Sequence, residues 1–283
     1  MSVTQRPLRR ILVVEDNQPL NELLLEVLGT SGYDVCGVAD GASALRELDA
    51  GVFDLVLLDL ELPKVSGLQI MEHLGQRPDA PKVIVMTGDD TPETIMRVVK
   101  GQACHFIAKP APASRFLEVV QQALTGTGEV LPIEVVSAKP DWVELVVPCQ
   151  LEIADRIESF MQGLNARLSP EVRDAMGLAF RELLMNAIEW GGKLDPTRKV
   201  RIACIRSDRI LQYRIQDPGP GFNPSNLQHA AISNAPDQPY SHMAARSEKG
   251  LRPGGFGMMM TRTSVDELIY NEAHNEVVFI KYL

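Results

Sequence analysis

The sequence contains few cysteines and no long apolar run. Its four cysteines, Cys36, Cys104, Cys149 and Cys204, are scattered along 283 residues, and no pair has CxxC spacing. This pattern predicts buried, reduced thiols and argues against a zinc site. The first apolar run, RRILVVED, is broken by acidic residues and is too short for a signal peptide or a membrane span. We therefore expect a cytoplasmic protein that has no membrane segment.

The sequence also lacks an excess of basic residues. It has 28 lysines and arginines against 37 aspartates and glutamates, which gives a formal net charge of -9. This balance argues against a general binder of nucleic acid or membrane surfaces, and no helix-turn-helix pattern or basic recognition helix is present. With 45% hydrophobic and 23% charged residues, a chain of this length is typical of a soluble globular protein with two domains.

Residues 9–124 alternate short apolar runs with amphipathic segments of helical period. The runs RRILVVED, YDVCGV, FDLVLLDL, PKVIVMTG and ACHFIAK predict five buried strands, each followed by a helix. Five such units predict a doubly wound α/β domain with a five-stranded parallel sheet, which we assign to residues 1–124. Residues 125–141 are richer in Gly, Pro and small residues and are assigned to a linker, although VLPIEVV within them could add a short strand.

The order of elements changes in residues 142–283. WVELVVP predicts a strand, two long helices follow, and KVRIACIR and RILQYRIQD predict a hairpin. FGMMMTRTSV predicts a helix, and ELIY and EVVFIKYL predict closing strands. Helices gathered apart from an antiparallel sheet indicate an α+β sandwich. The polar stretch from Asn223 to Pro253 is too long for a routine connection, so we expect a lid or a binding loop there.

Charged and polar residues stand where strands of the first domain are expected to end. The first strand ends in Glu15 and Asp16, the third in Asp59, the fourth in Thr87 and the fifth in Lys109. Ligands of parallel α/β sheets bind at the carboxyl ends of the strands. Carboxylates that converge there need a cation, and oxygen ligands suit Mg²⁺. A lysine within reach can pair with a phosphoryl oxygen.

The segments VVEDN, LLDLELPKVSGL, VMTGDD and HFIAKP resemble the receiver domains of two-component response regulators, which have a flavodoxin-like fold. The resemblance implies that Asp59 accepts a phosphoryl group from a cognate histidine kinase. It also implies a Mg²⁺ site formed by Glu15, Asp16, Asp59 and the backbone carbonyl of Glu61. The switch residues that it implies are Thr87 and Lys109, which contact the phosphoryl oxygens, and Phe106, whose rotamer reports phosphorylation. Glu61, two residues beyond Asp59, is a small departure that can tune self-dephosphorylation.

In the second domain, the helix ELLMNAIEWGG places Glu182 and Asn186 one turn apart beside an apolar stripe. Alone, this pair is typical of a solvated helix edge. The segments DPGPGF, residues 217–222, and PGGFGM, residues 253–258, are equally ambiguous in isolation, because proline and glycine are the strongest turn formers. Glycines before a helix can, however, leave its N-terminal N–H groups free to bind phosphate.

In this order the three segments resemble the GHKL ATP-binding module that histidine kinases, gyrase-type ATPases and anti-sigma serine kinases share. The resemblance implies that Asn186 completes a Mg²⁺ shell and that Asp217 accepts a hydrogen bond from the adenine amino group. It implies further that Gly219 and Gly221 let the base approach the backbone, and that Gly255 and Gly257 lie near the phosphates. Glu182 stands where the family places its catalytic base.

The motifs most closely resemble bacterial anti-sigma-factor serine kinases, which sequester a sigma factor and phosphorylate an anti-sigma antagonist. This resemblance implies a response regulator whose output domain is an ATP-dependent protein serine/threonine kinase, with a possible homodimer. Two other functions stay open: a sequestration module that uses ATP only as a structural ligand, and an ATP-hydrolysing switch without a protein substrate. The long polar stretch and the ending Trp190-Gly191-Gly192, where the family often has His-Gly, are departures. No phosphoacceptor helical hairpin precedes the module, which argues against autophosphorylation on histidine.

Overall fold

The computed structural model describes residues 8–89, 91–125, 131–222, 243–244 and 257–283. The chain divides into two compact units, Met1–Val130 and Leu131–Leu283, and each is described separately. Every helix in these described ranges is too short or too polar to cross a membrane.

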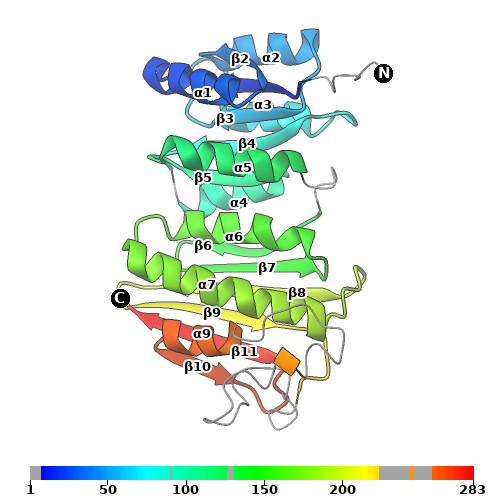
Figure 1. Ribbon diagram of the computed structural model, residues 1–283, viewed down its shortest axis with the longest axis vertical. Helices are drawn as coiled ribbons and strands as arrows, with labels where there is room; N and C mark the ends of the chain where they lie inside the picture. The colour runs from blue at the N-terminus through cyan, green and yellow to red at the C-terminus, as the bar shows by residue number, and fades with distance from the viewer. Residues whose placement is uncertain (1–7, 90, 126–130, 223–242, 245–256) are drawn as a thin grey trace. The chain divides into compact units, whose positions relative to one another are not determined.

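The first unit is a five-stranded parallel sheet with the strand order β2-β1-β3-β4-β5 (Figure 1). Its strands are β1 (Arg10–Val14), β2 (Asp34–Val38), β3 (Leu55–Asp59), β4 (Lys82–Thr87) and β5 (His105–Ala108). Its helices are α1 (Gln18–Thr30), α2 (Gly41–Ala50), α3 (Gly67–Leu74), α4 (Pro92–Lys100) and α5 (Ala113–Thr125). The five predicted βα units and the doubly wound parallel sheet are therefore confirmed.

Both faces of this sheet are buried, which explains why its strands are apolar without alternation. Ile11 and Val13 of β1 belong to a core cluster with residues of α1 and α5. The intervening residues, Leu12 and Val14, have 0% exposure as well, although they point to the opposite face. Polar residues stand at the ends of the strands: Arg10, Asp34, Lys82 and His105 begin β1, β2, β4 and β5, whereas Asp59 and Thr87 end β3 and β4. The carboxyl ends of the strands all lie at one edge of a parallel sheet.

The second unit is a six-stranded antiparallel sheet with the order β10-β11-β9-β8-β7-β6. Its strands are β6 (Glu134–Lys139), β7 (Trp142–Pro148), β8 (Lys199–Arg206), β9 (Ile210–Gln216), β10 (Glu267–Tyr270) and β11 (Glu276–Tyr282). Helices α6 (Glu152–Leu164), α7 (Pro170–Asn186) and α9 (Gly257–Ser264) cover one face of the sheet (Figure 1). The predicted α+β sandwich is confirmed.

Local sequence signals explain the start of α7, and its end departs from the regular helix that we predict. Ser169 caps the helix by accepting a hydrogen bond from the Val172 N–H at 3.4 Å, and Pro170 occupies the first turn. After Asn186 the helix widens into a π-helical turn, η1 (Ala187–Gly191), in which the Gly192 N–H donates to the Ala187 carbonyl at 2.8 Å. Such turns are rare and occur frequently at functional sites.

The structure also differs from the prediction at the domain boundary. Strand β6 lies within residues 125–141, which we assign to a linker, and it pairs with β7 from Glu134 to Lys139. The second unit accordingly begins at Leu131 rather than at residue 142. The apolar, largely β-branched segment VLPIEVV is the signal for this strand. Most of the predicted lid, residues 223–253, lies outside the described residues.

Candidate functional sites

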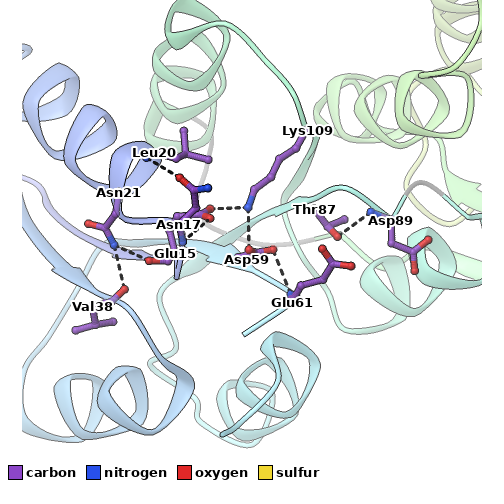
Figure 2. A network of polar contacts seen from close by, with 10 residues as sticks. All are labelled: Glu15, Asn17, Leu20, Asn21, Val38, Asp59, Glu61, Thr87, Asp89 and Lys109. Atoms are coloured by element: carbon purple, nitrogen blue, oxygen red, sulfur yellow. Dashed lines mark hydrogen bonds and ion pairs between the residues drawn. The ribbon is translucent and has the colours of Figure 1, made fainter. Parts of the chain in front are cut away.

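A polar cluster occupies the carboxyl edge of the parallel sheet (Figure 2). Lys109 Nζ lies 2.6 Å from Glu15 Oε2 and 2.8 Å from Asp59 Oδ2, so one ammonium group joins the ends of β1, β3 and β5. The other oxygen of Asp59, Oδ1, accepts a hydrogen bond from the Glu61 N–H at 3.2 Å. Glu15 and Asp59 are 1% and 3% exposed, whereas Asp16 is exposed. The structure thus brings together the acidic residues and the lysine that the sequence predicts.

The charges of this cluster favour a bound cation. Carboxylate oxygens of Glu15, Asp16 and Asp59 all lie within 4.8 Å of one another, and Lys109 supplies a single positive charge against them. Burial, aided by the nearby Asp59 charge, raises the pKa of Glu15 despite its contact with Lys109. Burial lowers the pKa of Lys109, but its hydrogen bonds to Asp59 and Glu15 outweigh this effect and raise the pKa overall. These hard oxygen ligands fit Mg²⁺.

The remaining predicted receiver residues lie at the end of β4, on β5 and just after β3. Thr87, at the end of β4, is completely buried, and its hydroxyl accepts a hydrogen bond from the Asp89 N–H at 3.1 Å. Phe106 on β5 is 3% exposed. Glu61 lies near Gly88, since a Cβ atom on this glycine would be 3.9 Å from Glu61 Oε2. Thr87 and Glu61 thus lie at the same edge of the sheet as Asp59 (Figure 2).

Two asparagines that sequence reasoning missed support the position of Glu15 (Figure 2). Asn21 is buried and donates to the carbonyl oxygens of Glu15 at 2.9 Å and Val38 at 3.1 Å, which ties the ends of β1 and β2 together. Asn17 caps α1 by accepting from the Leu20 N–H at 3.1 Å, and its own N–H donates to Glu15 Oε1 at 3.3 Å. The only sequence signal for the role of Asn21 is its position, about one turn into the amphipathic helix α1.

In the second unit, α7 carries Glu182 and Asn186 as predicted. Leu183 and Leu184 are buried, while Glu182 and Asn186 are half-buried at the border of this apolar stripe. Glu182 lies against the first residue of α9, because a Cβ atom on Gly257 would be 2.7 Å from Glu182 Cδ. A carboxylate at a helix N-terminus is electrostatically favourable. The helix face that carries the candidate base therefore meets the helix that begins within the second glycine motif.

Asp217 is fixed in a tight turn at the end of β9. Its Oδ1 accepts a hydrogen bond from the Gly219 N–H at 2.7 Å, and its own N–H donates to the Asn275 carbonyl at 2.9 Å. Burial raises the pKa of Asp217, which the Gly219 hydrogen bond and the Arg198 charge partly oppose. Arg198 donates to the carbonyl oxygen of Pro218. A half-buried acceptor held in this way suits a ligand that donates a hydrogen bond.

Backbone conformation and packing also require glycine in this turn, in addition to the predicted approach of the adenine base. Gly221 has φ +83°, and a Cβ atom there would overlap the Ala273 carbonyl oxygen. The Asn275 side chain donates to the Gly219 carbonyl at 3.1 Å, so the β10–β11 connection supports the turn. Sequence reasoning missed Asn275 and Arg198, because neither has a local motif. Gly255 lies outside the described residues.

The two units correspond to two known domain families. A model of the response regulator receiver domain matches residues 11–121, and a model of the histidine kinase-like ATPase domain matches residues 148–281. The chain therefore belongs to the proteins that join a response regulator receiver domain to a histidine-kinase-like ATPase domain. The second match begins at Pro148, the last residue of β7, and includes Glu182, Asn186 and Asp217.

Individual relatives match about two fifths of the chain. The CAI-1 autoinducer sensor kinase/phosphatase CqsS of Vibrio cholerae is 36% identical over 115 residues, which is 40% of this chain and 17% of that protein. The regulatory protein VirG of Agrobacterium tumefaciens is 34% identical over 120 residues, 42% of this chain and 44% of that protein. The chain thus spans less than half the length of these two relatives.

Matches to solved structures cover a similar share of this chain. A CheY-like receiver domain protein from Methanospirillum hungatei is 27% identical with a TM-score of 0.41 and covers 42% of this chain and 94% of its own. The response regulator TrrA of Thermotoga maritima, solved in complex with Mg²⁺-BeF, is 30% identical with a TM-score of 0.38. It covers 41% of this chain and 100% of its own.

Proposed function

We propose that the receiver domain accepts a phosphoryl group on Asp59 from a cognate histidine kinase. The support is the placement of the Asp59 carboxylate, which Lys109 and the Glu61 N–H hold from two directions at 2.8 and 3.2 Å. Attack by one carboxylate oxygen on phosphorus forms an acyl phosphate and breaks the bond to the histidine nitrogen of the donor. Lys109 and Thr87 then contact the new phosphoryl oxygens. Glu15, Asp16, Asp59 and the backbone carbonyl of Glu61 would hold Mg²⁺, which would supply positive charge beside the transferred group.

The ATPase domain, we propose further, binds ATP·Mg²⁺ and acts as a protein serine/threonine kinase of the anti-sigma-factor type. Asp217 accepts a hydrogen bond from the adenine amino group, and Asn186 provides an amide oxygen to the metal. Glu182 takes the proton from the attacking hydroxyl group. The observation that carries this proposal is the position of Glu182 one turn before Asn186 and against the start of α9.

The test is transfer of labelled phosphate from ATP to candidate antagonist proteins by the full chain. We expect label on a serine or threonine of one antagonist with the wild type and a strong loss with Glu182→Ala. Glu158→Ala is a matched control, because Glu158 lies on α6 and pairs with Arg181 instead. Phosphorylation of the antagonist at the wild-type rate by Glu182→Ala would contradict the assignment of the base.

A sequestration module is the second candidate function. The observation that favours it is Trp190, whose side chain is exposed (47%) at the end of η1, where the resembled family often has histidine. Exposed tryptophans are typical anchors of protein interfaces. In this case the chain would bind a sigma factor or an antagonist in an ATP-dependent manner without transferring phosphate. Binding with no labelled product would support this second function.

A further inference from the structure

The turn η1 ends at Gly191 and is followed by Gly192, and the surroundings of both glycines leave no room for a side chain. A Cβ atom on Gly192 would lie 2.5 Å from Cys149 Cβ and 2.9 Å from the Ile188 carbonyl oxygen. A Cβ atom on Gly191 would overlap both the carboxyl group and the Cβ atom of Asp217. The end of η1 therefore packs directly against Asp217, the residue that follows β9.

Backbone conformation does not explain why residue 191 is glycine. Gly191 lies within the helical turn, and among the described glycines only Gly32 and Gly221 have positive φ. In a helical conformation alanine is favoured over glycine, since glycine loses more backbone entropy on folding. The requirement at position 191 therefore comes from the contact with Asp217.

This contact also limits where the Asp217 carboxylate can lie. Gly219 is part of the same packing, because a Cβ atom on it would lie 2.8 Å from Asp217 Oδ1 and 2.9 Å from the Gly191 carbonyl oxygen. Oδ1 is occupied by the Gly219 N–H. Among the described residues no side chain or backbone group donates to Oδ2, which leaves this oxygen for a ligand.

We propose that Gly191 is a positioning residue that determines which base the nucleotide site accepts. Because Gly191 has no side chain, Asp217 can lie where its Oδ2 accepts a hydrogen bond from the exocyclic amino group of adenine. Guanine has a carbonyl oxygen at the corresponding atom, which would face the carboxylate as a second acceptor. The proposal rests on the proposed function, since it assumes that a purine nucleotide binds at Asp217.

The first test compares ATP·Mg²⁺ and GTP·Mg²⁺ binding to the full chain by titration calorimetry. In Gly191→Ala the methyl group displaces Asp217, so we expect ATP affinity to fall about 5- to 150-fold, the range for one lost hydrogen bond. GTP affinity should stay unchanged, so the preference for ATP shrinks by the same factor. Gly177→Ala is the matched control, because Gly177 lies on α7 with open space around it. An unchanged ATP-to-GTP preference in Gly191→Ala overturns the proposal.

The second test needs no nucleotide and uses thermal unfolding of the full chain, in which the transition of the ATPase domain is followed. Gly191→Ala should lower the melting temperature in the wild-type background but not in an Asp217→Gly background, where no side chain remains to clash. An equal loss in both backgrounds overturns the proposal. If the wild type binds neither nucleotide, the proposed function and the adenine role fail together, whereas this cycle still shows whether Gly191 positions Asp217.

Discussion

Replacement of Lys109 by methionine should destabilise the receiver domain in a way that Mg²⁺ reverses. The variant keeps the length of the side chain but leaves Glu15 and Asp59 without their shared cation. Their side chains are 1% and 4% exposed, and that of Lys109 is 18% exposed. Breaking a buried pair costs about 3–5 kcal/mol, and the partial exposure of the lysine places the expected loss near the lower figure.

The expected loss is large enough to measure by scanning calorimetry. For a domain of about 110 residues, about 2.1 cal/mol/K of unfolding entropy per residue converts about 3 kcal/mol into a fall of roughly 13 °C in Tm. Mg²⁺ at about 100 times its Kd returns about 2.7 kcal/mol. The variant should gain more from the metal than the wild type, because its carboxylates have no other cation.

The stability of the receiver domain should depend on pH in a definite direction for each of these groups. Burial raises the pKa of Glu15, so its ionised form destabilises the folded state, and stability returns as the pH falls through the raised pKa. In the wild type, the pKa of Lys109 is raised, so its contribution is complete below about 10.4, the ordinary lysine value, and is lost above its folded pKa.

The matched control is Lys64→Met. Lys64 pairs with Asp40 at 2.9 Å, but its side chain is 63% exposed, so the Tm of this variant should differ little from that of the wild type. A Lys109→Met variant that unfolds at the wild-type temperature without Mg²⁺ would refute the view that one ammonium group neutralises the cluster. A loss of Tm that Mg²⁺ and acid leave unchanged would refute it as well.

Three further predictions concern the proposed chemistry. Asp59→Asn removes the nucleophilic carboxylate, so a small phosphodonor with Mg²⁺ should label the wild type but not this variant; equal labelling would contradict the assignment. Asp217→Asn places an N–H donor where adenine also donates, and calorimetry should show ATP affinity weakened by about 1–3 kcal/mol; unchanged affinity would argue against adenine recognition there. Asn186→Ala should abolish ATP·Mg²⁺ binding, whereas Glu182→Ala should keep it and slow phosphate transfer about 10²–10⁴-fold. Equal, modest stability losses in the last two variants, with no selective effect on chemistry, would indicate a solvated helix edge.

Hydrophobic pattern was sufficient to predict the fold of both domains. Buried parallel strands are apolar throughout, so the exceptions at their ends, such as Asp59 and Lys109, were visible in one sequence. The second site was harder to predict, because its parts come from α7, the turn after β9 and the start of α9. Only the resemblance to a known family connected Glu182 with Asp217 before the structure was known.

Residues that act through tertiary contacts could not be predicted. Asn275 supports the Asp217 turn from the β10–β11 connection, and its sequence neighbours give no sign of this. Gly191 appeared in the sequence only as part of a helix ending. The π-helical turn has no pattern of its own, since it uses residues that also suit a regular helix. Strand β6 was partly predictable, because an apolar segment stands inside the stretch assigned to a linker.

The burial of three of the four cysteines lets their labelling rates report on local opening of the two domains. None of the four cysteines forms a disulfide; Cys104 is buried in the receiver domain, and Cys149 and Cys204 are buried in the ATPase domain. Cys36 is only half-buried, which departs from the prediction of four buried thiols. Burial raises the pKa of Cys204 to about 12, so at neutral pH almost none of this residue is a reactive thiolate in the folded state. Alkylation must then wait for local opening. Because Cys149 packs against Gly192, its labelling rate would follow the opening of η1, while Cys104 would record the receiver domain in the same sample.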